Sequence, residues 1–512
     1  MILSRSAQII LETIDLLARD SLVRLSEGDD VEERVMAPTA ELAPDGTLLE
    51  APLDDGFRVV TGNLFNFLSR LNEEFSKALL EIDPHSEEYL DYLNEEVILL
   101  RTAGKVQKYY QNLNKMDRVA DVALLRIESL YSKYIPRFDA HNLSSSTKSV
   151  QDALFQLEDS PFHRLCKFLL SQGDALIKTR TVLFLVYNYA MHNHFSKARD
   201  LFLMSHVQEH IFQANISTQI LYNRTLAHLG LCAFRNGLYH DALQSISDLY
   251  STGRIKEFLA QSSAGRYDKK EFPALEKASQ VPYHLHISMD LLDAVHVISA
   301  MLLEIPHMAL NAPDDRRHVT SRNFRKLWVS YNKSFFNSPP ETTRDVAMAA
   351  ALCLSLADWS KAYGLILRLK MWQLIPFAAR VQQELLGALK KAALKVYLLT
   401  RGYRYKTIGL DRLVAMFELE ESKITSIVNQ MITREDLEAS WDQISQCIVI
   451  QSSKPNDLQE ASVLLSDKLA SLVELNERII ELRTGPIFGS KEQQQVSRSR
   501  RFGLRKSRSL KK

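Results

Sequence analysis

The chain has 512 residues, and its 46% hydrophobic and 24% charged side chains are typical of a globular protein long enough for more than one core. Its 17 glycines and 15 prolines are few for this length, which argues against a strand-rich, turn-rich fold and predicts an all-α class. The net charge of +1 hides an acidic first sixty residues and a last fifteen residues without any acid, which indicates different partners for the two ends.

The sequence first predicts an N-terminal helix and acidic linker over residues 1–58. Residues 6–26 have the apolar spacing of an amphipathic helix, and residues 27–58 are rich in Asp, Gly and Pro. Helical periodicity returns in an N-terminal helical region over 59–160, which a polar linker near 141–151 interrupts. Its three predicted helices span 62–82, 87–113 and 118–134.

Residues 161–385 carry a pattern that occurs three times: a helix, a short polar turn, an aromatic residue, two further residues and an alanine. The pairs are Phe195 with Ala198, Tyr239 with Ala242, and Trp359 with Ala362. In the middle copy, Gly230 and Gly237 complete the spacing of a tetratricopeptide-type helix hairpin. A single copy is explained equally well by chance and by a true repeat. Three copies favour a repeat.

A single hairpin cannot bury its apolar face alone, so hairpins of this kind must stack. The copies are unevenly spaced, with breaks near 262–280 and 335–344. We therefore predict TPR-like helical repeats that form a right-handed helical solenoid with long insertions.

Residues 386–453 predict a winged helix. A helix over 386–399 is followed by LDRLVAMFEL, by ESKITSIVNQMIT, and then by a hairpin of LEASW, the turn DQ and QCIVIQ. Winged helices often bind DNA through the third helix, but here acids outnumber cations around it. The cations are Lys423 and Arg434, and the acids are Glu420, Glu421, Glu435 and Asp436. We predict protein contact rather than DNA contact, with a free wing edge able to pair with another subunit.

Residues 454–485 predict one long C-terminal helix. Its apolar residues form a near-heptad stripe, which is typical of a bundle of helices from several subunits. The stripe consists of Leu458, Leu465, Leu472, Leu475 and Ile479. A helix packed back on its own domain would carry the same stripe, so both interpretations remain open.

Residues 486–512 predict a basic disordered tail that is too polar to form a core. Contact of its cations with RNA phosphates would be independent of sequence and sensitive to salt. The candidate RNA-contacting residues are Arg498, Arg500, Arg501, Arg505, Lys506, Arg508, Lys511 and Lys512. A solvated tail or a nuclear-import signal is the alternative.

The chain contains no GxxxxGK[ST], HExxH or GxSxG sequence, and no GxGxxG that opens a helix after a strand. Its close histidine pairs, His192 with His194 and His284 with His286, have no Cys or carboxylate at ligand spacing. The four cysteines lie far apart, without Cys-x-x-Cys spacing. We predict that the chain is not an enzyme and has no catalytic residue, metal, cofactor or small-molecule substrate.

No stretch approaches 18 uninterrupted apolar residues, and the apolar run near the N-terminus contains Glu12 and Asp15. We therefore predict a cytoplasmic protein without membrane contact.

Helical repeats that lead into a winged helix resemble the PCI domain, the shared module of the proteasome lid, the signalosome and the third eukaryotic translation initiation factor. Longer stretches resemble the family of that factor's C subunit, and the likeness runs from about residue 60 to residue 480. These stretches are DPHSEEYLDYLNEE from Asp83, ARDLFLMSH from Ala198, QILYNRTLAHLGLCAFRNGL from Gln219, VPYHLHISMDLLDAVHVISAMLLEIPHMA from Val281, FELEESKITSIVNQMITREDLEASWDQ from Phe417 and KLASLVELNERI from Lys468.

The resemblance implies a non-catalytic scaffold that assembles the factor through its PCI domain, above all with the PCI domain of the factor's A subunit, and through a bundle of C-terminal helices. It also implies docking on the small (40S) ribosomal subunit and its rRNA during the initiation of protein synthesis, with other initiation factors as further possible partners. The alternative is a PCI scaffold subunit of a proteasome-lid-like or signalosome-like complex.

Two departures from the family limit what is carried over. Most of the family's N-terminal extension is missing, so its contact with start-codon factors is not expected here, and the sequence leaves open whether the chain is a fragment. The tail has Arg/Ser repeats where relatives often have Arg/Gly-rich sequence, so its RNA contact stays a hypothesis.

Overall fold

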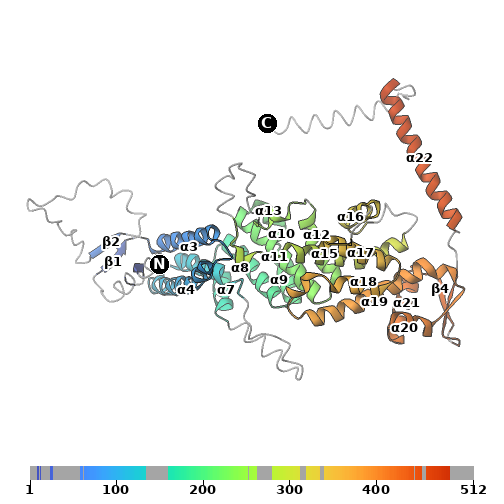
Figure 1. Cartoon of the computed structure of the whole chain (residues 1–512). Coiled ribbons are helices and arrows are strands. Elements are labelled where there is room, and N and C mark those ends of the chain that lie inside the picture. The colour runs from blue at the N-terminus through green and yellow to red at the C-terminus, as the bar shows by residue number, and fades with distance from the viewer. Residues whose placement is uncertain are drawn as a thin grey trace, which may run out of the picture. The chain divides into compact units, whose positions relative to one another are not determined.

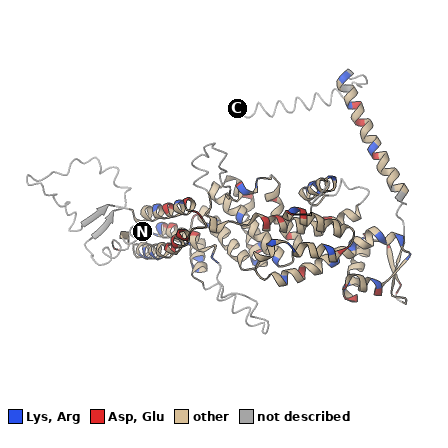
Figure 2. Ribbon diagram, viewed as in Figure 1, with Lys and Arg blue, Asp and Glu red and all other residues tan. Residues whose placement is uncertain are grey.

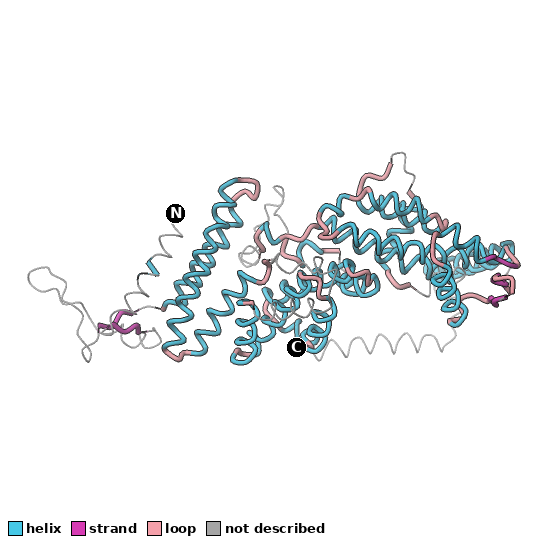
Figure 3. Tube along the Cα trace, turned by 90° about the horizontal axis from the view of Figure 1, so that it is seen from below, coloured by secondary structure: helices cyan, strands magenta, loops and turns pink. Residues whose placement is uncertain are grey.

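The computed structural model describes residues 9–10, 12, 23–26, 58–61, 63–133, 160–251, 253–261, 280–311, 319–334, 339–442, 444–451 and 457–484. These residues form helices joined by turns and loops, with two small groups of strands, as Figures 1 and 3 show. The chain divides into two compact units, one from residues 1–306 and 320–393, the other from 307–319 and 394–512. The all-α prediction is confirmed.

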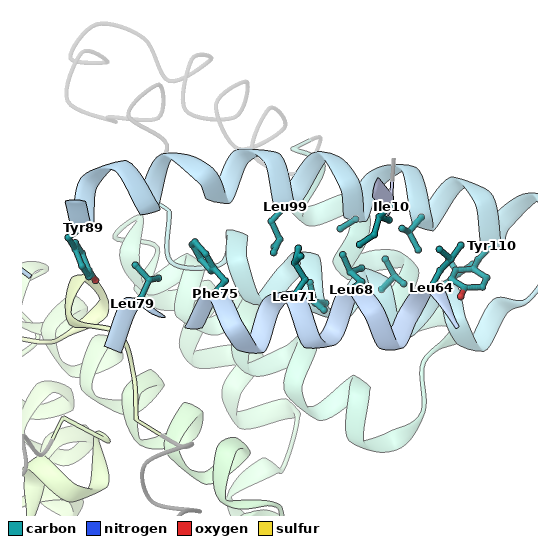
Figure 4. Close-up of a cluster of buried hydrophobic side chains, with 14 residues drawn as sticks. Ile10, Leu64, Leu68, Leu71, Phe75, Leu79, Tyr89, Leu99 and Tyr110 are labelled. Atoms are coloured by element: carbon teal, nitrogen blue, oxygen red, sulfur yellow. The ribbon is translucent and has the colours of Figure 1, made fainter. Parts of the chain in front are cut away.

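The first unit begins with three helices, α3 (Leu64–Glu81), α4 (Glu87–Asn112) and α5 (Met116–Leu130), as the sequence predicts. Asn63 caps α3, because its side-chain oxygen accepts the N–H of Phe65 at 3.0 Å. Figure 4 shows the core between α3 and α4, where Phe75 and Leu99 are buried and Ile10 joins from the N-terminal segment. Each such side chain stabilises the fold by about 1.5–3 kcal/mol.

The predicted N-terminal helix over 6–26 is wrong at its end. Val23–Ser26 is strand β1, which pairs in parallel with β2 (Arg58–Thr61) in the register Val23↔Arg58. The β-branched Val59 and Val60 on β2 favour a strand, and the pairing satisfies backbone groups that a fraying helix end would leave free. The predicted linkers over 27–58, 141–151 and 262–280 lie outside the described residues, apart from Arg58, which belongs to β2, and Gln280.

The rest of the first unit is a succession of short antiparallel helix hairpins with connecting turns. Its helices are α7 (Pro161–Gln172), α8 (Ala175–Met191), α9 (Phe195–Met204), α10 (Val207–His210), α11 (Ile216–Arg235), α12 (Tyr239–Tyr250), α13 (Ile255–Phe258), α15 (Met289–Leu310), α16 (Arg322–Lys333), α17 (Thr343–Ser355), α18 (Trp359–Leu367) and α19 (Ala378–Arg401), with 3-10 turns at Ile211–Gln213, Tyr283–Leu285 and Lys370–Gln373. The last few residues of α15 and of α19 are assigned to the second unit.

Each of the three aromatic residues predicted from the repeat pattern is the first residue of a helix: Phe195 opens α9, Tyr239 opens α12 and Trp359 opens α18. The alanine three positions later is fully buried in every copy. Two residues before each aromatic, the backbone enters the left-handed region, at Asn193, Gly237 and Ala357.

These left-handed residues close the same C-terminal turn on the preceding helix. In the middle copy the N–H of Leu238 donates to the carbonyl of Ala233 at 2.9 Å, and the N–H of Gly237 donates to Phe234 at 3.0 Å. The other two copies repeat this pair of hydrogen bonds, which defines the Schellman motif. The predicted hairpin pattern is therefore a structural repeat.

The hairpin of α4 and α5 has the same turn, which the sequence pattern missed. Asn114 is left-handed, the N–H of Lys115 donates to Tyr110 at 3.2 Å, and α5 starts at the next residue. Met116 and the buried Val119 occupy the positions of the aromatic and the alanine. The sequence pattern missed this copy because it required an aromatic residue and an alanine, whereas the turn geometry is the same.

Gly230 lets α11 and α12 approach closely, as predicted. A Cβ atom at this position would lie 2.4 Å from Cγ1 of Ile246, which is far inside van der Waals contact. Both helices bury their facing residues here. Only glycine fits this crossing without a shift of the Ile246 side chain.

Helix α15 is the most apolar long element of the first unit. Over 283–310 its length and composition would suffice to cross a membrane, but 61% of the qualifying window is buried inside the protein. Leu292, Val295 and Met301 are among its buried residues. We therefore describe it as the core helix of this unit.

The second unit contains the winged helix. It consists of the end of α19, β3 (Thr407–Gly409), α20 (Leu410–Phe417), α21 (Glu421–Thr433), β4 (Ala439–Asp442) and β5 (Cys447–Ile450). The sheet order is β3-β5-β4, with both pairs antiparallel. Leu413, Val428 and Ile448 form part of its core.

Three details of the predicted winged helix need correction. Its first helix, α19, starts at Ala378 rather than 386, because the i,i+4 pair Arg380–Glu384 and further helical residues extend it backwards. Strand β3 was not predicted, because three residues give no periodic signal. The wing turn is longer than DQ, since Asp442 still pairs with Cys447 in the sheet.

The predicted C-terminal helix is confirmed as α22 (Asp457–Thr484), one continuous helix of 28 residues.

Candidate interaction surfaces

The apolar residues of α22 are exposed. The five residues predicted to form its stripe, Leu458, Leu465, Leu472, Leu475 and Ile479, are between 48% and 84% exposed. Exposed apolar surface of this extent on one helix is typical of a protein interface. The contact of this stripe with helices of other subunits stays a prediction, as does the alternative in which it packs back on its own domain.

The apolar surface of α22 is wider than the predicted stripe. Leu464, Leu469, Val473 and Ile480 are also exposed. At 100° per residue, these residues and the stripe cover about half of the helix circumference, whereas a two-stranded coiled coil buries a narrower seam. The geometry fits a helix with at least two neighbouring helices. The ribbon of Figure 2 shows acidic and basic positions mixed along the helix.

The winged-helix sheet has two edges that are unpaired within the described part of the chain. Strand β5 is central, so β3 and β4 each use one side only. Edge strands present free N–H and C=O groups that can pair with another chain. The free wing edge predicted from the sequence corresponds to β4.

The wing carries an exposed isoleucine at its tip. Ile444 is 97% exposed, and its N–H donates to Oδ1 of Asp442 at 3.2 Å. The hydroxyl of Ser445 donates to the other oxygen of Asp442 at 2.6 Å, and these hydrogen bonds lower the pKa of the Asp442 carboxyl. The hydrogen-bonded turn thus holds the Ile444 side chain exposed at the tip of the wing, where a partner protein could bury it.

The charges around α21 agree with the predicted preference for protein. Nζ of Lys423 pairs with Glu420 at 3.0 Å, which neutralises one of the two cations. Glu421 and Glu435 remain exposed. Phosphate groups would be repelled from this side of the winged helix.

The first unit contains a partly open apolar pocket of about 290 Å³, which the sequence did not indicate. Residues of α8, α11, α15 and the segment 374–376 line it, and its polar wall consists of His228 and Arg235. Nε2 of His228 lies 2.9 Å from the hydroxyl of Tyr187. Burial, with Arg224 and Arg235 nearby, holds the pKa of His228 well below its usual value, so the imidazole is neutral.

The two predicted histidine pairs are engaged in structural contacts. Nδ1 of His284 lies 2.9 Å from the hydroxyl of Tyr89, and Nε2 of His286 lies 2.9 Å from the carbonyl of Val281. His192 is buried, and burial lowers the pKa of His194. Among the described residues, no group of three or more His, Cys, Asp or Glu side chains is arranged to hold a metal ion.

The candidate RNA-contacting residues of the tail all lie outside the described residues, so their contacts stay a prediction. Their residue numbers run from 498 to 512.

Comparison with known proteins gives two family matches. The model for the N-terminus of eukaryotic translation initiation factor 3 subunit 8 matches residues 8–314. The PCI domain model matches residues 372–452, which comprise α19 and the winged helix.

Curated relatives agree with these matches. The C subunit of eukaryotic translation initiation factor 3 from Culex quinquefasciatus is 37% identical over 449 residues, which cover 86% of this chain and 49% of the relative. The protein of the same name from Xenopus tropicalis is 38% identical over 445 residues, with 84% and 48% covered, and that from Schizosaccharomyces pombe is 34% identical over 447 residues, with 83% and 48% covered. The chain spans about half the length of the curated relatives it matches.

Proposed function

This chain belongs to the family of the C subunit of eukaryotic translation initiation factor 3, and on that premise we propose that it is a non-catalytic scaffold subunit of initiation factor 3 in the cytoplasm. In this role it assembles the factor through its PCI domain and α22, and helps it bind the small ribosomal subunit. Family membership favours this role over that of a proteasome-lid-like or signalosome-like subunit.

The observation that carries the proposal is the apolar half of α22, which is exposed over the whole described helix. A helix of 28 residues is about 42 Å long, so a bundle along its full length would bury many apolar side chains. The free edges of β3 and β4 offer a second contact, for which the PCI domain of the factor's A subunit is our proposed partner.

Co-purification tests the bundle. The variant Leu465→Asp, Leu472→Asp, Ile479→Asp adds three charges to the apolar half of α22, and we expect it to lose the other factor 3 subunits from a tagged full-length chain. The control Gln459→Asp, Ser466→Asp, Ser471→Asp adds the same charge on the polar side of α22 and should retain them. Equal retention by both variants would refute a role for α22 in assembly.

We propose that the eight tail cations add a salt-sensitive contact with rRNA. Their replacement by glutamine should reduce the slope of log affinity for single-stranded RNA against log salt by about 5–6, at about 0.7 per lost phosphate contact. An unchanged slope would show that the tail does not bind RNA.

A further inference from the structure

Helix α16 is anchored to the first unit by its buried side. Phe324 is fully buried, and Nε of Arg325 contacts Oε1 of Glu304 at 2.5 Å. The other oxygen of Glu304 accepts the N–H of Thr320 at 3.1 Å and of Ser321 at 3.2 Å. Because Glu304 is fully buried, these contacts fix both the position and the rotation of α16.

The opposite side of α16 is a line of cations. Arg322, Lys326 and Lys333 are exposed, and within the described residues none of them forms an ion pair. At 100° per residue they fall within about 40° of one another, on the side directly opposite Phe324. No acidic residue occurs between residues 319 and 334. In the ribbon of Figure 2 the helix α16 carries blue Lys and Arg positions.

The three cations follow one another along the helix axis. Arg322 and Lys326 are about 6 Å apart along the axis, and Lys326 and Lys333 about 10 Å, at 1.5 Å per residue. The exposed Ser330 and Asn332 add hydrogen-bond donors beside this line. A row of cations with neutral donors is the composition that contacts a chain of phosphates.

A membrane surface does not fit this helix. Membrane binding needs an apolar face that can enter the lipid, but Phe324 is packed inside the protein. Ring stacking at a centroid distance of 6.3 Å joins Trp328 to Phe324. Val329 is the one large aliphatic residue of α16 that is exposed.

We propose that the exposed side of α16, defined by Arg322, Lys326 and Lys333, is a binding surface for the phosphodiester backbone of RNA. The proposal rests on the proposed function, which brings the chain to the ribosome, and it adds a structured RNA contact that is independent of the basic tail. The contact is electrostatic and independent of base sequence.

The test is RNA binding by the full-length chain with the eight tail cations already replaced by glutamine, so that the tail does not mask the effect. We expect Arg322→Glu, Lys326→Glu, Lys333→Glu to weaken binding to a fluorescent single-stranded RNA by about 10- to 100-fold at 100 mM salt, and to lower the salt slope by about 2. The matched control Arg70→Glu, Lys108→Glu, Lys167→Glu changes three exposed cations on α3, α4 and α7 and should bind as the parent does.

Equal affinity of the triple variant and its control would overturn the proposal. So would an acidic peptide that binds through these three residues while RNA does not, because the surface would then recognise protein. Circular dichroism of both variants excludes loss of helix as the cause.

Co-purification with the other factor 3 subunits separates this proposal from the proposed function. If the parent chain fails to co-purify but the triple variant still loses RNA, the proposed function falls and the α16 surface stands. If the parent co-purifies and the triple variant keeps RNA, the α16 surface falls alone.

Discussion

The hydroxyl of Tyr89 on α4 joins His284, a residue 195 positions away in the turn before α15. It accepts the backbone N–H of His284 at 3.2 Å and lies 2.9 Å from Nδ1 of the same residue. Burial, with Lys133 and Arg224 nearby, lowers the pKa of His284, so the ring is neutral and Nδ1 can accept the hydroxyl proton. One side chain thus connects the N-terminal helices to the segment that leads into the core helix.

We expect Tyr89→Phe to lower the free energy of unfolding by about 1–2 kcal/mol, because it removes both hydrogen bonds of the hydroxyl and leaves the N–H of His284 without its acceptor. Urea denaturation followed by circular dichroism measures the change. Tyr92→Phe on the same helix removes a hydroxyl without a hydrogen bond in the described structure and should change stability little. Equal effects of the two substitutions would contradict this role of Tyr89.

Gly230→Ala should destabilise the first unit by about 1–3 kcal/mol, because the added Cβ would lie 2.4 Å from Cγ1 of Ile246 and must displace that buried side chain. The second substitution Ile246→Ala makes room for the Cβ, so the double variant should show less than the sum of the two single effects. Gly364→Ala is the control, since its Cβ meets nothing within 4 Å. Additive effects of Gly230→Ala and Ile246→Ala would exclude the clash.

The turn residues Gly237 and Ala357 are equivalent, so opposite substitutions should have opposite effects. Ala357→Gly should stabilise the chain by about 0.5–1 kcal/mol, because φ of 64° is unfavourable for alanine. Gly237→Ala, at φ of 74°, should destabilise it by a similar or larger amount. The shift in the thermal unfolding midpoint measures both effects on stability. Shifts of the same sign for the two variants would refute the shared turn geometry.

His296 should make the first unit less stable in acid. Its ring is 1% exposed and stacks on Tyr250 with centroids 4.1 Å apart. Burial lowers its pKa to about 4, while Asp293 raises it and Arg344 lowers it further. Both nitrogens are buried without a hydrogen-bond partner in the described structure.

The folded pKa of His296 lies below the ordinary value of 6.5, so the unfolded chain binds more protons between pH 4 and pH 6.5. The contribution of neutral His296 to the free energy of unfolding is therefore complete above pH 6.5. It is lost as pH falls, by roughly 2 kcal/mol between pH 7 and pH 5. His296→Phe keeps a stacked ring and should remove this part of the pH dependence in urea denaturation. The exposed His85→Phe should leave it unchanged, and an unaltered pH dependence of His296→Phe would exclude this role.

Local sequence predicted much of the fold correctly, because local interactions determine those parts. Apolar residues three and four apart specified α3, α4, α5 and α22. The aromatic residues at 195, 239 and 359 marked helix starts. Both signals are local because a helix and its terminal turn depend on residues within one or two turns. The same sequence, through its long matching stretches, indicated the family and the winged helix.

Tertiary structure alone decided the features that depend on distant residues. The pairing of β1 with β2, the third strand of the wing and the contact of Tyr89 with His284 join segments with no periodic signal. Whether an amphipathic stripe is buried or free also depends on what packs against it. For this reason the sequence predicted the stripe of α22 with two interpretations, and the exposure of its apolar residues is a property that only the folded chain shows.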